Sequence, residues 1–224
     1  MVSDHDRRVL QDLARQVADA AALPVHHERR ELWQQHNDLK LKKPLMLIFP
    51  EGSWRELIPK REVEDDALAG IEFQLRSRLY TFEHFQDDTV LEKAWPVRKV
   101  VRNSGWGLQK KNIPSTEARG AWHFDPVIHS AADLKKLTHP TIEYDDKATQ
   151  KNLDFHRDLF GDILDVKLSG VPRLCYHLMN QYTGWRGLEE MMMDMYCEPQ
   201  MLHDAMAFLT EGHKKVLQQH LDQD

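Results

Sequence analysis

Polar side chains of several chemical types follow directly after a short apolar run near residue 50. In PLMLIFPEGSWRELIP, Leu45–Phe49 is continuously apolar, and Glu51, Ser53 and Arg55 come within a few positions of its end. A carboxylate can move a proton, and a guanidinium can orient a substrate carboxylate. We therefore predict a site in which Glu51 is catalytic and Ser53 and Arg55 bind substrate. The alternative is a local helix start, capped by Ser53 with Glu56 at its third helical position.

Two further segments carry candidate site residues. In FEHFQDDTV, Asp87 and Asp88 are adjacent, so only one of them can face a pocket. We predict that Asp87 acts as a general base or orients the substrate, and structural capping of a loop is the alternative. Tyr176 and His177 follow a predicted strand through a Gly-Val-Pro turn. This position favours substrate binding, although Tyr-His pairs also pack under loops.

These candidates must be held by regular elements, which the apolar pattern predicts. Three- and four-residue spacing predicts a series of helices, with Ser3 as the N-cap of the first. These helices cover residues 3–22, 25–40, 62–78, 131–138, 147–160, 186–197 and 199–222. Apolar runs predict strands at 45–49, 79–85 and 165–170. The first run does not alternate with polar residues, so we expect a parallel strand that is covered on both faces. Helices between parallel strands predict an α/β fold with the site at the carboxyl ends of the strands.

Composition sets limits on the function. The chain has 224 residues, 29% of them charged, and a formal net charge of −6, which argues against a nucleic-acid partner. No apolar run is long enough to cross a bilayer, and the first residues lack the apolar core of a signal peptide. We therefore expect a cytoplasmic protein with no membrane partner. Cys175 and Cys197 fit a reducing compartment without a disulfide framework.

Four segments together resemble the N-terminal part of the uroporphyrinogen decarboxylase-like (URO-D) superfamily. They are PLMLIFPEGSWRELIP, FEHFQDDTVLEKAWP, KLSGVPRLCYHLMNQ and EPQMLHDAMAFLTEGHKKVLQQHLDQ. The resemblance covers most of residues 25–222 and is closest to the branch associated with corrinoid-dependent methyl transfer. It implies a (β/α)₈ barrel, of which the predicted strands supply only the N-terminal part. We expect a helical extension at 1–40, then a partial barrel at 41–224 with an irregular insertion at about 86–130.

The resemblance also implies a function. In full-length form, the protein is expected to take a methyl group from a small methylated or methoxylated substrate and pass it to a corrinoid protein. This branch holds zinc with a His-x-Cys pair and a distant cysteine, and zinc activates thiols or water. The chain contains no His-x-Cys. Zinc and the corrinoid protein are therefore implied only for a full-length homologue, and no cofactor is expected in this chain.

Two other functions stay open. Decarboxylation of a porphyrinogen is disfavoured, because Glu51 stands where the resemblance predicts an arginine that neutralises substrate carboxylates, while Arg55 matches the second such arginine. The other possibility is a non-catalytic half-barrel that pairs with a complementing chain or forms a homo-oligomer. An incomplete barrel exposes sheet edges and apolar surface, which favours such pairing.

Overall fold

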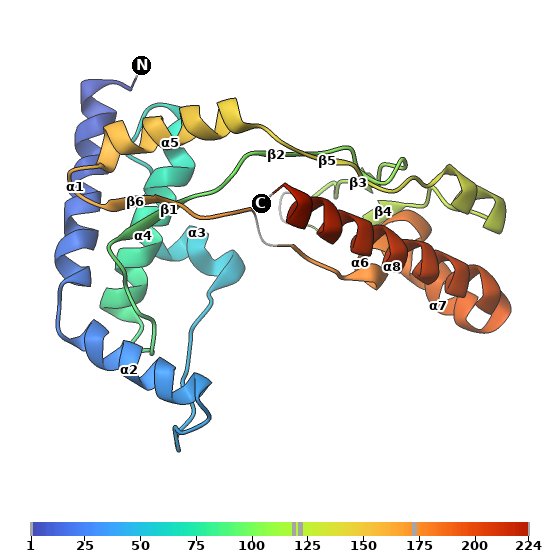
Figure 1. The fold of residues 1–224 in the computed structure, drawn as a ribbon, viewed down its shortest axis with the longest axis horizontal. Helices are drawn as coiled ribbons and strands as arrows, with labels where there is room; N and C mark the ends of the chain where they lie inside the picture. Colours follow the sequence, from blue (N-terminus) through green and yellow to red (C-terminus); the bar gives the residue numbers. More distant parts are fainter. Residues whose placement is uncertain (1, 118–119, 121–122, 172–173, 224) are drawn as a thin grey trace. The chain divides into compact units, whose positions relative to one another are not determined.

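The fold of the chain is seen in a computed structural model, which describes residues 2–117, 120, 123–171 and 174–223 (Figure 1). The chain is 56% helical, and its strands are short and form two-stranded sheets. This confirms the predicted α/β class. The described residues do not form a barrel.

Two compact units make up the chain. Unit 1 comprises Met1–Arg98 and Ala148–Ser169, and unit 2 comprises Lys99–Lys147 and Gly170–Asp224. The boundary that the sequence predicts at residue 40 does not coincide with a division between these units.

Helices form most of unit 1. They are α1 (Asp4–Ala21), α2 (Val25–Asn37), η1 (Glu51–Ser53), α3 (Trp54–Leu57), η2 (Asp66–Leu68), α4 (Ala69–His84) and most of α5 (Asp146–Phe160). Helix α1 begins as predicted at Ser3, whose Oγ accepts a hydrogen bond from the Asp6 N–H at 3.0 Å. It packs against α4, and both Leu10 and Leu75 are fully buried in this core. Amphipathic spacing therefore predicts α1 correctly because the apolar stripe has a partner helix.

A small parallel sheet completes unit 1. Strand β1 (Ala94–Val97) pairs with β6 (Asp165–Leu168), and Trp95 lies opposite Val166. The Trp95 indole is buried against Phe160 and donates its N–H to His156 Nδ1 at 3.1 Å. The prediction of a strand at 165–170 is confirmed, whereas β1 lies in a region that was expected to be irregular.

Two other strand predictions in unit 1 are wrong. Leu45–Phe49 is an extended connection between α2 and α3 without a strand partner (Figure 1), and the Phe49 side chain is 75% exposed. Residues 79–85 were expected to form a strand, but they continue α4 as far as His84. Leu75 and Leu79, one helical turn apart, are both buried, which explains why the helix does not end earlier.

Unit 2 combines two antiparallel strand pairs with a 3₁₀ helix and three α-helices in its described residues. Strand β2 (Val101–Asn103) pairs with β5 (Ile142–Tyr144), and β3 (Lys111–Ile113) pairs with β4 (His123–Asp125). The helices are η3 (Ala131–Lys136), α6 (Leu178–Arg186), α7 (Leu188–Cys197) and α8 (Pro199–Asp222). Helices α7 and α8 confirm the prediction, whereas α6 was not predicted. Tyr182 and Trp185 of α6 are fully buried, so this helix supplies much of the core.

Candidate functional site

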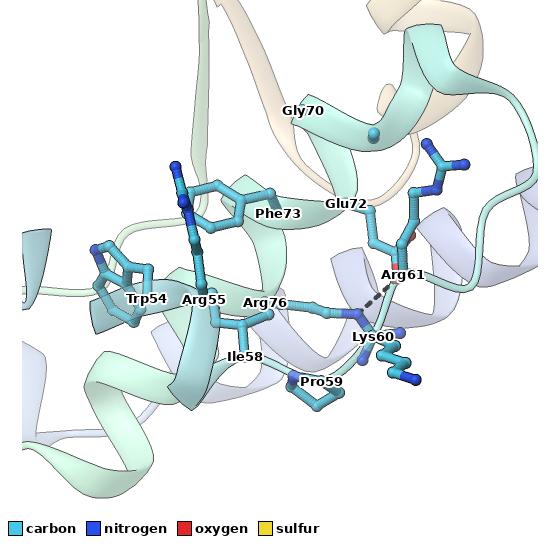
Figure 2. A pocket seen from close by; sticks show the side chains of 11 residues that line it. Trp54, Arg55, Ile58, Pro59, Lys60, Arg61, Gly70, Glu72, Phe73 and Arg76 are labelled. Atoms are coloured by element: carbon cyan, nitrogen blue, oxygen red, sulfur yellow. Dashed lines mark hydrogen bonds and ion pairs between the residues drawn. The ribbon is translucent and has the colours of Figure 1, made fainter. Parts of the chain in front are cut away.

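A pocket of about 520 Å³ lies in unit 1 between α3, the segment after it and the first turns of α4 (Figure 2). Small-molecule sites commonly have volumes of roughly 300–1,000 Å³. Apolar and cationic side chains line this pocket together. They include Trp54, Arg55, Lys60, Arg61, Phe73 and Arg76.

Aromatic contacts hold the short helix α3 on α4 and form one wall of the pocket. The Trp54 ring meets Phe73 edge-on at 6.3 Å and Tyr80 edge-on at 6.0 Å. It also packs against Phe85 at 6.1 Å. Edge-to-face contacts at these distances are favourable and fix ring orientation. The wall of Trp54 and Phe73 is therefore a preformed surface on which a flat apolar group can pack.

Cations surround this wall, and they differ in whether they are already neutralised. Arg76 donates to Glu62 and Glu72, each at 2.7 Å, and Arg61 is ion-paired with Asp66. Arg55 and Lys60 have no carboxylate partner among the described residues. Figure 2 shows Arg55 beside Trp54 and Phe73, with Lys60 and Arg61 toward the other side. The pocket thus offers positive charge next to an aromatic surface.

A buried carboxylate fixes the rim of the pocket. Glu72 of α4 is 1% exposed and accepts hydrogen bonds from the N–H groups of Glu62 and Val63, both at 3.0 Å. It also accepts a bond from Arg76 Nε at 2.7 Å. Burial alone raises the pKa of Glu72, but these backbone and guanidinium hydrogen bonds outweigh burial and hold the pKa below its ordinary value. Glu72 therefore positions the chain that carries Lys60 and Arg61.

A second carboxylate holds the same stretch of chain from the side of α1. Asp6 is buried and accepts hydrogen bonds from the N–H groups of Glu64 at 2.8 Å and Asp65 at 3.4 Å. The bond from the Glu64 N–H is the main reason why the pKa of Asp6 lies below its ordinary value. The rim of the pocket is thus fastened to two helices.

The predicted site residues of this region lie in different places. Arg55 lines the pocket, as expected of a substrate-binding residue, whereas Glu51 and Ser53 are exposed and do not line it. Ser53 makes no side-chain cap of α3, so the alternative of a local helix cap is not seen either. Glu51 has a φ of 49°, in the left-handed region that non-glycine residues seldom adopt. Phe73 and Arg76 were not predicted as site residues. They lie on the same face of α4, about one helical turn apart.

Asp87 has a different environment from the one predicted. It is 3% exposed, and its carboxylate accepts hydrogen bonds from the N–H groups of Ile48 at 3.0 Å and Thr89 at 3.1 Å, and from Thr89 Oγ1 at 2.9 Å. The neighbouring Asp88 accepts a bond from the Met46 N–H at 2.8 Å. Asp87 does not line the pocket. These contacts match the loop-capping alternative.

Tyr176 and His177 belong to unit 2. The Tyr176 ring meets His213 of α8 edge-on at 5.2 Å, and both line a shallow, mostly apolar pocket of about 280 Å³. Burial lowers the pKa of His213, so the ring is neutral near pH 7. His177 is exposed at the start of α6 and makes no side-chain cap there.

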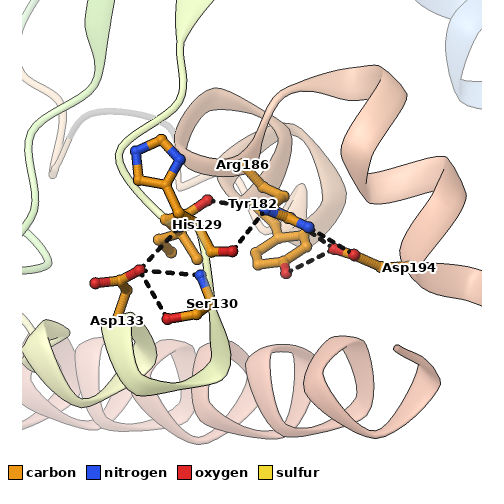
Figure 3. A network of polar contacts seen from close by, with 7 residues as sticks. His129, Ser130, Asp133, Tyr182, Arg186 and Asp194 are labelled. Carbon is orange, nitrogen blue, oxygen red and sulfur yellow. Dashed lines mark hydrogen bonds and ion pairs between the residues drawn. The ribbon is translucent and has the colours of Figure 1, made fainter. Parts of the chain in front are cut away.

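A network of polar contacts in unit 2 joins α6, α7 and the chain around His129 (Figure 3). Arg186 of α6 forms a bidentate pair with Asp194 of α7, with both N–O distances at 2.8 Å. It also donates to the backbone carbonyls of Ile128 and His129. Tyr182 donates to Asp194 at 3.4 Å, and burial is the main reason why its pKa is raised to about 12. Each charge is used to join elements, so the network is structural.

The described part of the chain contains no group of three or more His, Cys, Asp and Glu side chains that could hold a metal ion. Cys175 and Cys197 are both exposed. Among the described side chains, none is grouped in a way that fits the zinc centre that the sequence resemblance implies for a full-length homologue. Within the same ranges, every helix is too short or too polar to cross a membrane.

Comparison with models of known protein families, with curated proteins and with solved structures finds no match to this chain. The likeness to the URO-D superfamily therefore rests on its sequence segments alone.

Proposed function

We propose that this chain binds a small aromatic carboxylate in the α3–α4 pocket. We further propose that, within a complete barrel, it presents a methyl or methoxy group of that ligand for transfer to a corrinoid protein. The observation that carries the binding proposal is the placement of Arg55 and Lys60, without carboxylate partners among the described residues, beside the wall of Trp54 and Phe73.

The chemistry of these side chains suits a flat anion. A guanidinium binds a carboxylate through two parallel hydrogen bonds, and Lys60 adds a point charge. The faces and edges of Trp54 and Phe73 favour an aromatic ring over an aliphatic chain of the same size. Glu72 carries no free charge into the pocket, because Arg76 and two backbone N–H groups use its oxygens. The pocket therefore favours ligands with one negative charge next to one ring.

The methyl-transfer part of the proposal comes from the sequence resemblance. In this account the chain's own residues bind and orient the substrate, and the reacting centre is supplied by other parts of a complete enzyme. The catalytic roles of Glu51 and Asp87 remain hypotheses, since neither lines the pocket. A tetrapyrrole with many carboxylates suits the pocket less well, because Arg61 and Arg76 are already paired.

The test is calorimetric titration of the full chain with 4-methoxybenzoate and with 4-methoxybenzamide, which lacks the charge. We expect the acid to bind and the amide to bind about tenfold more weakly or worse, as loss of a charge-assisted hydrogen bond predicts. Arg55→Gln should weaken binding of the acid by a similar factor. The matched control is Arg15→Gln on α1, which removes an exposed arginine that does not line the pocket. Equal affinities for acid and amide, or equal effects of the two substitutions, contradict the proposal.

A further inference from the structure

The extended segment Leu45–Phe49 is hydrogen-bonded along one edge only, among the residues that the structure describes. The N–H of Met46 donates to Asp88 and the N–H of Ile48 donates to Asp87, while the Met46 carbonyl accepts from the Asp88 N–H at 2.9 Å. Backbone groups of alternate residues point to the same side only in an extended strand. Residues 87–88 therefore occupy the edge formed by the even-numbered residues.

The opposite edge is open. The odd-numbered residues Leu45, Leu47 and Phe49 have no backbone hydrogen-bond partner among the residues that the structure describes. Pro44 and Pro50, which lack an N–H, both fall on the even-numbered side. No proline thus blocks the open edge. A row of free N–H and C=O groups of this kind is a template for another strand.

Most side chains of the segment are also partly open to solvent, and Leu47 and Phe49 line a hollow beside α2. Met46 is 58% exposed and Phe49 is 75% exposed, and no charged residue interrupts the run. Contiguous exposed apolar side chains of this size mark contact surfaces in natural proteins. Backbone edge and side chains together point to a strand-pairing site.

We infer that this edge pairs with the same edge of a second copy of the chain, antiparallel and centred on Leu47. In this register Leu47 lies opposite Leu47 of the other copy, and Leu45 lies opposite Phe49. Each of these pairs is of the type that exchanges two backbone hydrogen bonds. The arrangement is isologous, so one two-fold axis satisfies both copies.

Charge at the ends of the segment favours this occupant and orientation. Lys43 precedes the run and Glu51 follows it, and neither has an ion-pair partner among the described residues. The extended conformation ends at Pro50, so Lys43 and Glu51 flank the paired residues, and in the antiparallel arrangement the Lys43 end of each copy faces the Glu51 end of the other. A parallel register instead places like charges together, which is unfavourable. The segment is therefore complementary to itself in one direction only.

So short a strand covers less area than the roughly 800 Å² per partner of a standard interface. We expect a reversible dimer whose population rises with concentration. The inference does not depend on ligand binding, because Leu45, Leu47 and Phe49 do not line the α3–α4 pocket.

The first test is sedimentation of the full chain over a concentration series. We expect the wild type to pass from monomer to dimer. Leu47→Pro removes the central free N–H without breaking a hydrogen bond within the chain, and should abolish the dimer. Leu47→Val keeps the N–H and should retain it, with circular dichroism confirming that both variants are folded. A wild type that is monomeric at every concentration, or a dimer that Leu47→Pro leaves intact, overturns the inference.

Charge exchange tests the partner and the register. Lys43→Glu and Glu51→Lys should each weaken the dimer, because each places like charges across the axis. The double variant Lys43→Glu/Glu51→Lys restores opposite charges and should recover dimerisation, with all effects reduced by salt. If both single variants lose the dimer and the double variant does not recover it, the antiparallel register is excluded.

Discussion

The buried carboxylate of Glu72 offers a sharp test of how the pocket is built. Glu72→Gln keeps the shape of the side chain but removes its charge. The new amide has one acceptor oxygen and an NH₂ group, whereas Glu72 meets only donors, namely two backbone N–H groups and Arg76 Nε. At least one of these donors then lacks an acceptor. The exposed Glu62 is then the remaining carboxylate of the two that Arg76 binds. The rim of the pocket should loosen as a result.

The size of this effect follows from the contacts. Breaking a buried ion pair typically costs about 3–5 kcal/mol, and an unsatisfied buried donor about 1–3 kcal/mol. Because the amide oxygen still accepts one hydrogen bond, we expect Glu72→Gln to lower the free energy of unfolding by about 3 kcal/mol, the lower end of the range for a buried ion pair. With a urea m-value of about 2 kcal/mol per molar, the unfolding midpoint should fall by about 1.5 M.

Glu62→Gln is the matched control, because it removes an exposed carboxylate that binds the same arginine. An exposed ion pair contributes about 0.2–1 kcal/mol, so this variant should unfold close to the wild type. Equal urea midpoints for the two variants refute the structural role of Glu72.

The free energy of unfolding should also depend on pH through Glu72. The folded-state pKa of Glu72 lies below the ordinary 4.5. The contribution of Glu72 to the free energy of unfolding is therefore complete above pH 4.5 and is lost as the pH falls through the folded-state pKa.

Three other outcomes are expected. Asp194→Ala removes the carboxylate partner of the largely buried Arg186 and should destabilise unit 2 by about 3–5 kcal/mol in urea unfolding. The control Glu189→Ala changes an exposed residue and should have little effect. Asp87→Ala should cost about 1–3 kcal/mol by the same assay but leave the affinity for 4-methoxybenzoate unchanged in calorimetry, because Asp87 fastens a loop outside the pocket. In an absorbance titration Tyr182 should ionise near pH 12, and stability should fall above the ordinary tyrosine pKa of 10.0, since the folded state favours the neutral phenol.

Helices with a partner along their apolar stripe were predictable from the sequence. The range 3–22 contains α1, and 147–160 and 199–222 match α5 and α8 closely. Leucines at helical spacing, such as Leu10, Leu153 and Leu209, are buried in the two cores. Amphipathic spacing is a local signal, so it needs no knowledge of the partner.

Strands were harder to predict, because a strand depends on a neighbour elsewhere in the chain. Leu45–Phe49 has the composition of a buried strand, yet among the described residues only 87–88 hydrogen-bond to its backbone. Conversely, Ala94–Val97 contains a proline and no alternation, and pairs with β6 all the same. The residues of a short segment do not show whether a strand partner exists elsewhere in the chain.

The candidate site was predictable in part. Arg55 was identified from its position after the apolar run and does line the pocket. Phe73 and Arg76 lie inside the helix predicted at 62–78, but they were missed because a helical pattern does not show that α3 packs on this face of α4. Asp87 was chosen for its chemistry, but its hydrogen bonds come from the chain's own backbone.

The central claim is that an aromatic acid binds against Trp54, and indole N–H resonances test it most directly. The chain has six tryptophans, and the buried indoles of Trp95 and Trp185 donate to His156 and to the Leu108 carbonyl. A two-dimensional ¹H–¹⁵N spectrum recorded during titration with 4-methoxybenzoate, with Trp54 assigned from Trp54→Phe, should show a saturable shift of the Trp54 signal while Trp95 and Trp185 stay in place. A Trp54 signal that does not move at any concentration of the acid contradicts the account.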